Sequence, residues 1–522
     1  MSKLPIGVQD FEKLREGGFI YVDKTKSIYD LVASGIPYFL SRPRRFGKSL
    51  LLSTMKCYFE GRRDLFDELD IIGLEDNSKE PWVSHPVFYF DFNQDNYTVN
   101  GSIENVLDRH LSMWESEYGN PGRAETLAGR FQYLIRKAVE KTGRRAVVLV
   151  DEYDKSLLES TRNKDLLEHN RAVFKGFFST LKSYDHYLKF VFLTGVTKFS
   201  KVSIFSDLNH LVDISLDDRY SSICGITEDE LEKNFKPEIE DMAAKLGVGQ
   251  DECLSRLREA YDGYHFSEDS KGVYNPYSLL NALSSKKIRY YWFETGTPTI
   301  LIEKLKKTGF DPKRFTEGGI RARETQLTDY GAENEDPIPL FYQTGYLTIR
   351  GFNPKYRSYT LGYPNNEVKY AMLESLESYF LKEEDGKGPL YIENFCEDLE
   401  NNDLDSLRDR FVSLFARLPY GQGEDYLERD FQNVIYIVFM LMGQFVQTEV
   451  HNAKGRADAV VCTEKNIFIF EFKRDGSALD ALQQIETHAY AAPYAADPRE
   501  IVKVGVNFDS EKRNITEWET VS

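Results

Sequence analysis

Three short stretches of the sequence carry residues that can bind phosphate or a metal ion. The first is Gly47-Lys48-Ser49, which follows an apolar run at 36–40 and precedes a helical run at 50–56. A strand, a tight loop, Gly-Lys-Ser and a helix form the frame of a phosphate-binding loop, in which backbone N–H groups face anionic oxygens. In that frame Lys48 reaches the β- and γ-phosphates of a nucleotide, and the Ser49 hydroxyl ligates Mg²⁺.

The loop departs from the usual motif at its first position. Arg42 stands where that motif has a glycine, five positions before Gly47. Gly-Lys-Ser also occurs at ordinary helix starts, so the tripeptide alone leaves both interpretations open. Arg42, Arg44, Arg45 and Lys48 form a basic patch whose simplest target is phosphate. We expect the nucleotide to be bound by Arg44, Arg45, Phe46, Gly47, Lys48, Ser49 and Leu50.

The second stretch is a pair of carboxylates, Asp151-Glu152, at the end of the aliphatic run 146–150. Ligands bind at the carboxyl ends of strands in open α/β sheets. There Asp151 would hold Mg²⁺ through water, and Glu152 would orient or deprotonate the attacking water. A further apolar run ends at Thr194. Either Thr194 or Thr197 could sense the γ-phosphate from this neighbouring strand, or the hydroxyl could serve only as a cap.

The third stretch lies near the C-terminus and contains Asp458, Glu471 and Lys473. If Glu464-Lys465 is a two-residue hairpin turn, Asp458 lies opposite Glu471, because each is six residues from the turn. Opposed residues project to one face of the sheet, and Lys473 shares that face. Asp458 and Glu471 would hold Mg²⁺, which activates water, while Lys473 orients the water or neutralises developing charge.

Taken together, several motifs resemble the AAA-ATPase-like family of bacterial proteins. They are Tyr21-Val22-Asp23-Lys24-Thr25, Arg42-Pro43-Arg44-Arg45-Phe46-Gly47-Lys48-Ser49, Asp151-Glu152-Tyr153-Asp154-Lys155 and Leu193-Thr194-Gly195-Val196-Thr197-Lys198-Phe199-Ser200-Lys201. That family carries this loop without the first glycine. The resemblance covers nearly the whole chain and implies ATP as the nucleotide.

The C-terminal residues resemble the core of the PD-(D/E)XK nuclease superfamily. Members of the AAA-ATPase-like family commonly end in a domain of this superfamily. The motifs are Gly455-Arg456-Ala457-Asp458 and Glu471-Phe472-Lys473. The resemblance implies that Glu428 is the acid of the first helix, that Gln484 lies near the site, and that Tyr490 follows it. It implies DNA as the substrate, in a setting of bacterial defence or mobile-element biology.

Other functions remain open. The chain could be a nucleotide-dependent switch or scaffold whose nuclease fold binds nucleic acid without cutting it, or an ATP-driven DNA translocase. Steady-state ATP hydrolysis by wild type and by Glu152→Gln separates rapid turnover from a switch, and stimulation by DNA would favour a translocase. The sequence does not decide whether the protein forms a homo-oligomer.

The elements that position these residues alternate between strands and helices, which predicts an α/β fold with a mainly parallel P-loop NTPase sheet. Strands are expected at 36–40, 87–92, 146–152 and 187–195, with helices through 102–141. We expect an ATPase core at 1–225, a helical lid or winged-helix-like subdomain at 226–310, and a mixed, partly helical connecting region at 311–417. The connecting region is expected to contain a strand pair at 341–349 and 358–361. An α/β restriction-endonuclease-like domain is expected at 418–522.

Composition narrows the class of protein further. The chain has 522 residues, of which 41% are hydrophobic, so it can bury more than one core. Its five cysteines are scattered without metal-binding spacing, which indicates a reducing cytoplasm. No apolar run is long enough to span a membrane. The net charge of −18 excludes a generally basic nucleic-acid-binding surface but allows a local basic groove.

Overall fold

The computed structural model divides the chain into two compact units. The first unit comprises Met1–Gly296 and Gly319–Glu367, and the second comprises Thr297–Gly318 and Val368–Ser522. The structure describes residues 3–78, 82–120, 122, 126–199, 211–293, 301, 304–305, 315, 319–328, 336–380, 391–416, 424–444, 447–450 and 457–522, without the side chains of 378–380, 424–430 and 449–450. The four-part domain division expected from the sequence stays a prediction.

A parallel five-stranded sheet forms the centre of the first unit. Its strands are β1 (Tyr38–Ser41), β2 (Val87–Asp91), β3 (Ala146–Asp151), β4 (Leu188–Gly195) and β5 (Val212–Asp213), in the order β2-β3-β4-β1-β5. Every neighbouring pair is parallel. The α/β fold with a parallel sheet is therefore confirmed. The order places β4 between β1 and β3, so the strand that carries Thr194 lies between the strand before the phosphate loop and the strand before the carboxylate pair.

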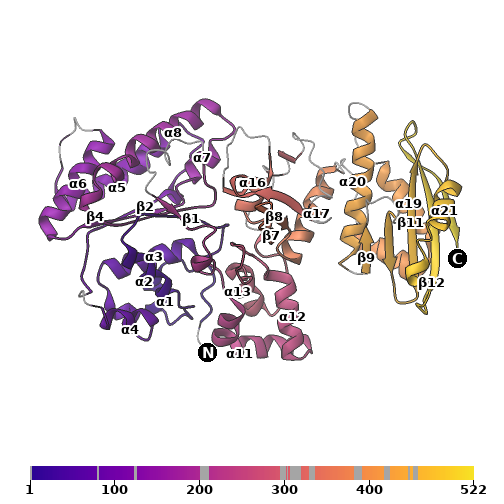
Figure 1. The fold of residues 1–522 in the computed structure, drawn as a ribbon, viewed down its shortest axis with the longest axis horizontal. Coiled ribbons are helices and arrows are strands. Elements are labelled where there is room, and N and C mark those ends of the chain that lie inside the picture. The colour runs from indigo at the N-terminus through magenta and orange to yellow at the C-terminus, as the bar shows by residue number, and fades with distance from the viewer. Residues whose placement is uncertain are drawn as a thin grey trace. The chain divides into compact units, whose positions relative to one another are not determined.

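Helices cover both faces of this sheet (Figure 1). On one face Phe90 of β2 contacts the rings of Trp114, Phe131 and Phe177. On the other, Phe59 contacts Phe190 of β4. Burial of these apolar side chains on both faces explains why the strands are continuous hydrophobic runs. The helices are α1 (Phe11–Glu16), α2 (Thr25–Ser34), α3 (Lys48–Phe59), α4 (Asp70–Asp76), α5 (Ser102–Tyr118), α6 (Leu127–Thr142), α7 (Lys155–Glu159), α8 (Lys164–Phe178) and α9 (Thr180–Ser183).

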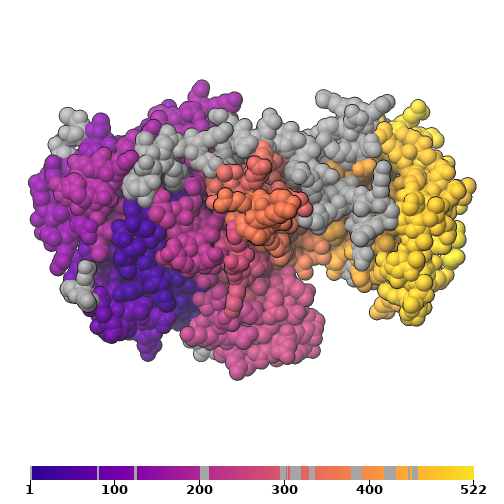
Figure 2. Space-filling view, in the orientation of Figure 1, coloured from indigo at the N-terminus to yellow at the C-terminus, as the bar shows by residue number. Residues whose placement is uncertain are grey.

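A helical segment follows the sheet within the first unit. It contains α11 (Glu228–Leu246), α12 (Gln250–Tyr261) and α13 (Pro276–Ser285). Thr227 caps α11 through a capping box with Glu230. On the face shown in Figure 2, the indigo N-terminal residues adjoin the pink residues of this segment. The two segments together line one side of the pocket described below.

A small antiparallel sheet completes the first unit. Its strands are β6 (Ile320–Arg323), β7 (Thr348–Asn353) and β8 (Ser358–Gly362), in the order β6-β8-β7, with helices α15 (Glu324–Thr328) and α16 (Ile338–Gln343). The strand expected at 341–349 is therefore wrong except at its last two residues, Thr348 and Ile349, where β7 begins. Residues 338–343 form a helix because Pro337 and Pro339 favour a helix start, and its apolar residues are buried on more than one side.

The second unit is built around a mixed five-stranded sheet with the order β13-β12-β11-β10-β9. Helix α20 and helix α21 lie on opposite sides of this sheet (Figure 1). Side chains alternate along β11, so that Phe470 and Phe472 contact Phe439 of α20, while Ile469 packs with Ile485 of α21. The elements are α17 (Asn366–Phe380), α18 (Ile392–Glu400), α19 (Leu404–Phe415), α20 (Glu424–Met442), β9 (Gln447–Val450), β10 (Ala459–Cys462), β11 (Asn466–Arg474), α21 (Ala478–Thr487), β12 (Glu500–Asp509) and β13 (Asn514–Val521).

In the part of the chain that the structure describes, no helix has the length and apolarity needed to cross a bilayer.

Candidate functional site

The phosphate loop has the geometry that anion binding requires. Helix α3 begins at Lys48, directly after β1 and the loop, and its N-cap is Gly47 in the left-handed region with φ 94°. A glycine adopts this conformation without the strain that a Cβ would cause. Because Gly47 has no side chain, no capping group competes for the first N–H groups of the helix, and the helix dipole favours an anion there.

Lys48 is held inside the loop. Its side chain is only 3% exposed, and Nζ donates hydrogen bonds to the carbonyl oxygens of Arg42 at 3.0 Å and Pro43 at 3.2 Å. The same Nζ lies 3.9 Å from Oε1 of Glu152. The loop therefore brings its cation to the carboxylate pair at the end of β3, as expected from the sequence.

Asp151 lies at the centre of a hydrogen-bond network. Its Oδ1 accepts from Oγ1 of Thr194 at 2.9 Å, and its Oδ2 accepts from the hydroxyl of Tyr89 at 3.3 Å. Burial raises the pKa of Asp151, and hydrogen bonds from Ser49 and Thr194 oppose that rise. A buried carboxylate next to the Ser49 hydroxyl has the hard oxygen atoms that Mg²⁺ prefers.

Thr194 lies behind Asp151. It is fully buried at the end of β4, and its hydroxyl is directed at the carboxylate. In this position its hydroxyl holds the Asp151 carboxylate, and the γ-phosphate sensing that was one of its two expected roles stays a prediction. Tyr89 was missed by sequence reasoning, although its place on the strand next to β3 follows once the sheet order is known.

Glu152 follows the end of β3 in a left-handed conformation, with φ 49°. A non-glycine residue in this region is uncommon, and the cost of this conformation is about 1–3 kcal/mol. The backbone turns here because Tyr153 donates its N–H to the carbonyl of Thr194 on β4 at 3.1 Å. The turn leaves the Glu152 side chain 18% exposed and within reach of Lys48. A partly exposed carboxylate at this place can contact a water molecule beside a bound phosphate.

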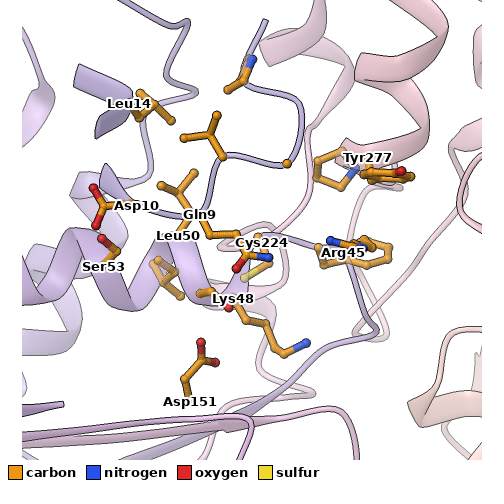
Figure 3. Close-up of a pocket in the computed structure, with 18 of the residues that line it drawn as sticks. Gln9, Asp10, Leu14, Arg45, Lys48, Leu50, Ser53, Asp151, Cys224 and Tyr277 are labelled. Carbon is orange, nitrogen blue, oxygen red and sulfur yellow. The ribbon is translucent and has the colours of Figure 1, made fainter. Parts of the chain in front are cut away.

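These groups lie at one end of a pocket of about 720 Å³. In Figure 3, Lys48 and Asp151 lie near each other, and Arg45 and Tyr277 lie together on another side. Pockets of about 300–1,000 Å³ hold small molecules and cofactors. The polar lining includes Arg44, Arg45, Gly47, Lys48, Ser49, Asp151 and Glu152, and the apolar lining includes Leu14, Val22, Leu50, Ile226 and Leu280.

Arg42 does not belong to the phosphate-binding patch, so that expectation is wrong. Its side chain is 1% exposed, and its guanidinium lies 4.1 Å from the centre of the Phe266 ring. The guanidinium donates to the carbonyls of Ser215 at 2.8 Å and Tyr220 at 3.1 Å. These acceptors direct the charge into the protein interior, where burial lowers the pKa of Arg42. Arg42 thus supports the loop from behind.

Phe46 is also directed inward. It is among the residues that line the pocket, but its ring is 1% exposed and packs edge-to-face against Tyr264 and Phe266. Its ring is therefore not available to stack on a base. Arg44 and Arg45 are exposed, and the Arg45 guanidinium lies 5.1 Å from the centre of the Tyr277 ring.

Asp154 is a buried carboxylate that the sequence analysis did not single out. Its oxygens accept from the backbone N–H groups of Val196 at 3.1 Å and Thr197 at 2.6 Å, and from the Thr197 hydroxyl at 2.7 Å. These bonds tie the segment after β3 to the segment after β4. The hydroxyl of Thr197, which was considered as a phosphate sensor, is thereby held by Asp154.

The second group of candidate residues lies on the mixed sheet of the second unit. The pairing of β10 with β11 runs from Cys462 opposite Ile467 to Ala459 opposite Phe470. The next pair in that register is Asp458 with Glu471, as the hairpin spacing predicts. Oδ2 of Asp458 also accepts the backbone N–H of Phe472 at 2.8 Å. The two carboxylates therefore lie side by side.

Lys473 and Gln484 complete this group. Nζ of Lys473 lies 3.2 Å from Oε1 of Glu471 and donates to Oε1 of Gln484 on α21. Nε2 of Gln484 donates to Glu471 and lies 3.2 Å from the Tyr490 hydroxyl. Strand β11 thus brings Glu471 and Lys473 together with Gln484 of α21 and with Tyr490, which follows that helix.

Glu471 is the most perturbed group in this cluster. Burial and the neighbouring charge of Asp458 raise the pKa of Glu471 to about 7, although Lys473 opposes the shift. Its side chain is buried, and Oε2 has no hydrogen-bond partner in the described structure. A buried carboxylate oxygen without a partner is costly, and a divalent cation would stabilise it.

The described residues contain no group of three or more His, Cys, Asp or Glu side chains arranged to hold a metal ion. Asp458 and Glu471 supply two carboxylates. Glu428 belongs to α20, but its side chain lies outside the described residues, as does Arg456. The hard oxygen atoms of the two carboxylates and the unpartnered Oε2 fit Mg²⁺.

Comparison with known proteins assigns families to the two regions of the chain that contain these groups. The model of a family described as predicted AAA-ATPase matches residues 5–205, and the model of the PD-(D/E)XK nuclease superfamily matches residues 426–518. The chain is 36% identical to an "uncharacterized protein in vnfD 5′ region" of Azotobacter chroococcum mcd 1, with 98% of each chain covered. The chain belongs to the AAA-ATPase-like family. As a family member it combines an NTPase-like domain with a C-terminal PD-(D/E)XK nuclease-like domain, and the phosphate loop and the Asp458–Glu471 pair fall within these two matched regions.

Proposed function

We propose that this protein hydrolyses ATP in its first unit and uses its nucleotide state to control a Mg²⁺-dependent DNA nuclease in its second unit. The observation that carries the proposal is the approach of Lys48 to Glu152, 3.9 Å apart and beside Asp151, at the polar end of a pocket large enough for a nucleotide. We expect this activity in the bacterial cytoplasm, in defence or mobile-element biology.

At the nucleotide site, each residue has a defined task. Lys48 and the N–H groups at the start of α3 would bind the β- and γ-phosphates, and Ser49 with Asp151 would hold Mg²⁺. Glu152 orients the attacking water or accepts its proton. The apolar lining that includes Val22 and Leu280 receives the base.

At the nuclease site, Asp458 and Glu471 would hold Mg²⁺, and the bound ion would supply an activated water and charge stabilisation at the phosphodiester. Lys473 lies beside both Glu471 and Gln484, so its ammonium group is positioned to stabilise negative charge that develops on the phosphate. Gln484 holds the Lys473 and Glu471 side chains in place from α21.

One observation favours a second candidate function, in which the nuclease fold binds nucleic acid without cutting it. The described residues place only two carboxylates together at the second site, and no third metal-ligating group joins them. In that case the protein would be a nucleotide-dependent switch.

Two assays on the full chain distinguish these functions. Phosphate release from ATP should be abolished by Lys48→Ala and reduced about 10²- to 10⁴-fold by Glu152→Gln, the usual contribution of a general base. In the presence of Mg²⁺ or Mn²⁺, the wild-type protein should cleave plasmid and linear DNA. The variants Lys473→Ala and Asp458→Ala should not. If the wild-type protein turns over ATP but cleaves DNA no faster than these variants, the nuclease is rejected and the switch is favoured. The absence of turnover would reject the ATPase.

A further inference from the structure

The backbone of the phosphate loop is hydrogen-bonded to Trp292, a residue 248 positions further along the chain than its acceptor, Arg44. The indole Nε1 of Trp292 donates a hydrogen bond to the backbone carbonyl of Arg44 at 3.0 Å. Trp292 is 5% exposed, and its ring packs against Tyr346 at a centroid distance of 5.2 Å. A movement of the loop backbone at Arg44 must therefore break this bond or move the indole with it.

Trp292 is itself held by a buried carboxylate. Its backbone N–H donates to Oε1 of Glu367 at 2.8 Å, and the Ser278 hydroxyl donates to Oε2 of Glu367 at 2.7 Å. Glu367 is only 1% exposed. Because an unpaired buried carboxylate costs far more than a paired one, Glu367 resists the loss of either partner.

Trp292 and Ser278 are each linked to residues that line the nucleotide pocket. Ser278 belongs to α13, whose residues Tyr277 and Leu280 line the pocket, and Tyr277 is the ring that faces the Arg45 guanidinium. Glu367 is thus connected to the phosphate loop through Trp292 and, through Ser278, to the part of the pocket wall that α13 forms. It joins two surfaces that a bound nucleotide would contact.

Glu367 also marks the point where the chain leaves the first unit. It lies in the first turn of α17, which begins at Asn366, and the residues from Val368 onward belong to the second unit. An acidic side chain in the first turn stabilises the helix by interacting with its dipole. A change in the contacts of Glu367 therefore changes the stability of the start of α17.

We propose that Trp292 and Glu367 are positioning residues that transmit nucleotide occupancy of the phosphate loop to helix α17, and thereby regulate the nuclease of the second unit. This regulation rests on the proposed function. When a nucleotide binds, the backbone at Arg44 and the wall at Tyr277 adjust, and the contacts of Glu367 report that adjustment to the start of α17.

The test is amide hydrogen exchange across residues 366–380 of the full chain, with and without the non-hydrolysable nucleotide AMP-PNP and Mg²⁺. Nucleotide affinity is measured separately by calorimetry on the same samples. Trp292→Phe keeps an aromatic ring but loses the donor to Arg44. Trp82→Phe is the matched control, because the Trp82 indole donates to the carbonyl of Tyr58 at 2.8 Å, away from the loop.

In wild type and in Trp82→Phe, AMP-PNP should change the exchange of α17. In Trp292→Phe that change should be lost, while the nucleotide dissociation constant rises by less than about tenfold, the effect of one neutral hydrogen bond. Glu367→Ala should also lose the change. Glu367→Gln should retain it, because an amide can accept from Trp292 and donate to the Ser278 oxygen.

Two results would overturn the inference while leaving the proposed function intact. One is a wild-type protein that binds AMP-PNP without any change in α17. The other is a Trp292→Phe variant that responds as wild type does. A wild-type protein that binds no nucleotide would reject the proposed function, and this inference with it.

Discussion

The carboxylate of Asp458 accepts a 2.8 Å hydrogen bond from the backbone N–H of Phe472, the residue between Glu471 and Lys473. This bond links the end of one strand to the functional segment of the next and fixes Asp458 beside Glu471. It also separates two roles of Asp458, since an amide could accept the same bond but would carry no charge for a metal ion.

Asp458→Asn is therefore expected to keep the fold and lose the nuclease. The thermal unfolding midpoint should stay close to that of wild type, whereas cleavage of plasmid DNA with Mg²⁺ should fall to background. Calorimetric titration with Mn²⁺ should show weaker binding, because one of two carboxylates has lost its charge. Asp480→Asn, at an exposed residue in the first turn of α21, serves as a control that should cleave normally. Undiminished cleavage by Asp458→Asn would exclude Asp458 as a metal ligand.

Metal binding at the second site should depend on pH. Because the pKa of Glu471 is raised to about 7, this group is mostly protonated below pH 7 and must release its proton to bind a cation. Mg²⁺ or Mn²⁺ affinity should thus increase as the pH rises from 6 to 8, with a slope of at most about tenfold per pH unit below 7. Calorimetry at several pH values measures this slope.

The same raised pKa predicts the sign of a stability effect in the metal-free protein. A carboxyl group with a higher pKa in the folded state favours folding at low pH, and this contribution is lost as the pH rises through about 7. Glu471→Gln should reduce both the pH dependence of metal affinity and that of stability. A variant with the wild-type pH profile would show that another group titrates.

Thr194→Val should slow ATP hydrolysis without preventing nucleotide binding. Valine has nearly the shape of threonine but cannot donate to Oδ1 of Asp151, so the carboxylate loses one partner. A hydrogen bond to a charged group contributes about 1.5–3 kcal/mol, which corresponds to a decrease in kcat of about tenfold to 150-fold if Asp151 acts in the transition state. Thr194→Ser retains the hydroxyl and should restore most of the rate. If Thr194 were only a packing residue, valine would be the better substitute of the two.

Arg42→Gly would restore the usual motif and is nevertheless expected to destabilise the first unit. The carbonyls of Ser215 and Tyr220 would lose their donor in a buried place, at a cost of about 1–3 kcal/mol each. Urea unfolding monitored by circular dichroism should show this loss. Arg44→Ala, with an exposed side chain, should change stability by no more than about 0.5 kcal/mol. Equal stability of Arg42→Gly and wild type would mean that the glycine is tolerated here.

Local patterns predicted much of this protein. The aliphatic runs that end at Asp151 and Thr194 correspond to β3 and β4, with strand bounds that differ from the expected ones by a residue. The pairing of Asp458 with Glu471 could be derived because a two-residue turn determines the register of both strands. In each case the information lies within a few residues of the site.

Long-range partners could not be predicted in this way. The carbonyls that bind Arg42 lie 173 and 178 residues further along the chain, and Trp292 lies 248 residues from Arg44. No periodicity or turn signal connects such positions. For the same reason Asp154 was not distinguished from its acidic neighbours, since its role depends on the backbone N–H groups of Val196 and Thr197, which follow β4 and lie 42 and 43 residues further along the chain.

The inward direction of Arg42 and Phe46 has a practical consequence for anyone who cuts this protein into fragments. Phe266 stacks beneath the guanidinium, and Tyr264 packs on Phe46, so residues well past 225 complete the rear of the phosphate loop. A recombinant fragment that stops at 225 lacks Tyr264 and Phe266, so the side chains of Arg42 and Phe46 would be exposed to solvent. Such a fragment should be insoluble when expressed, even though it contains every residue that would touch the triphosphate.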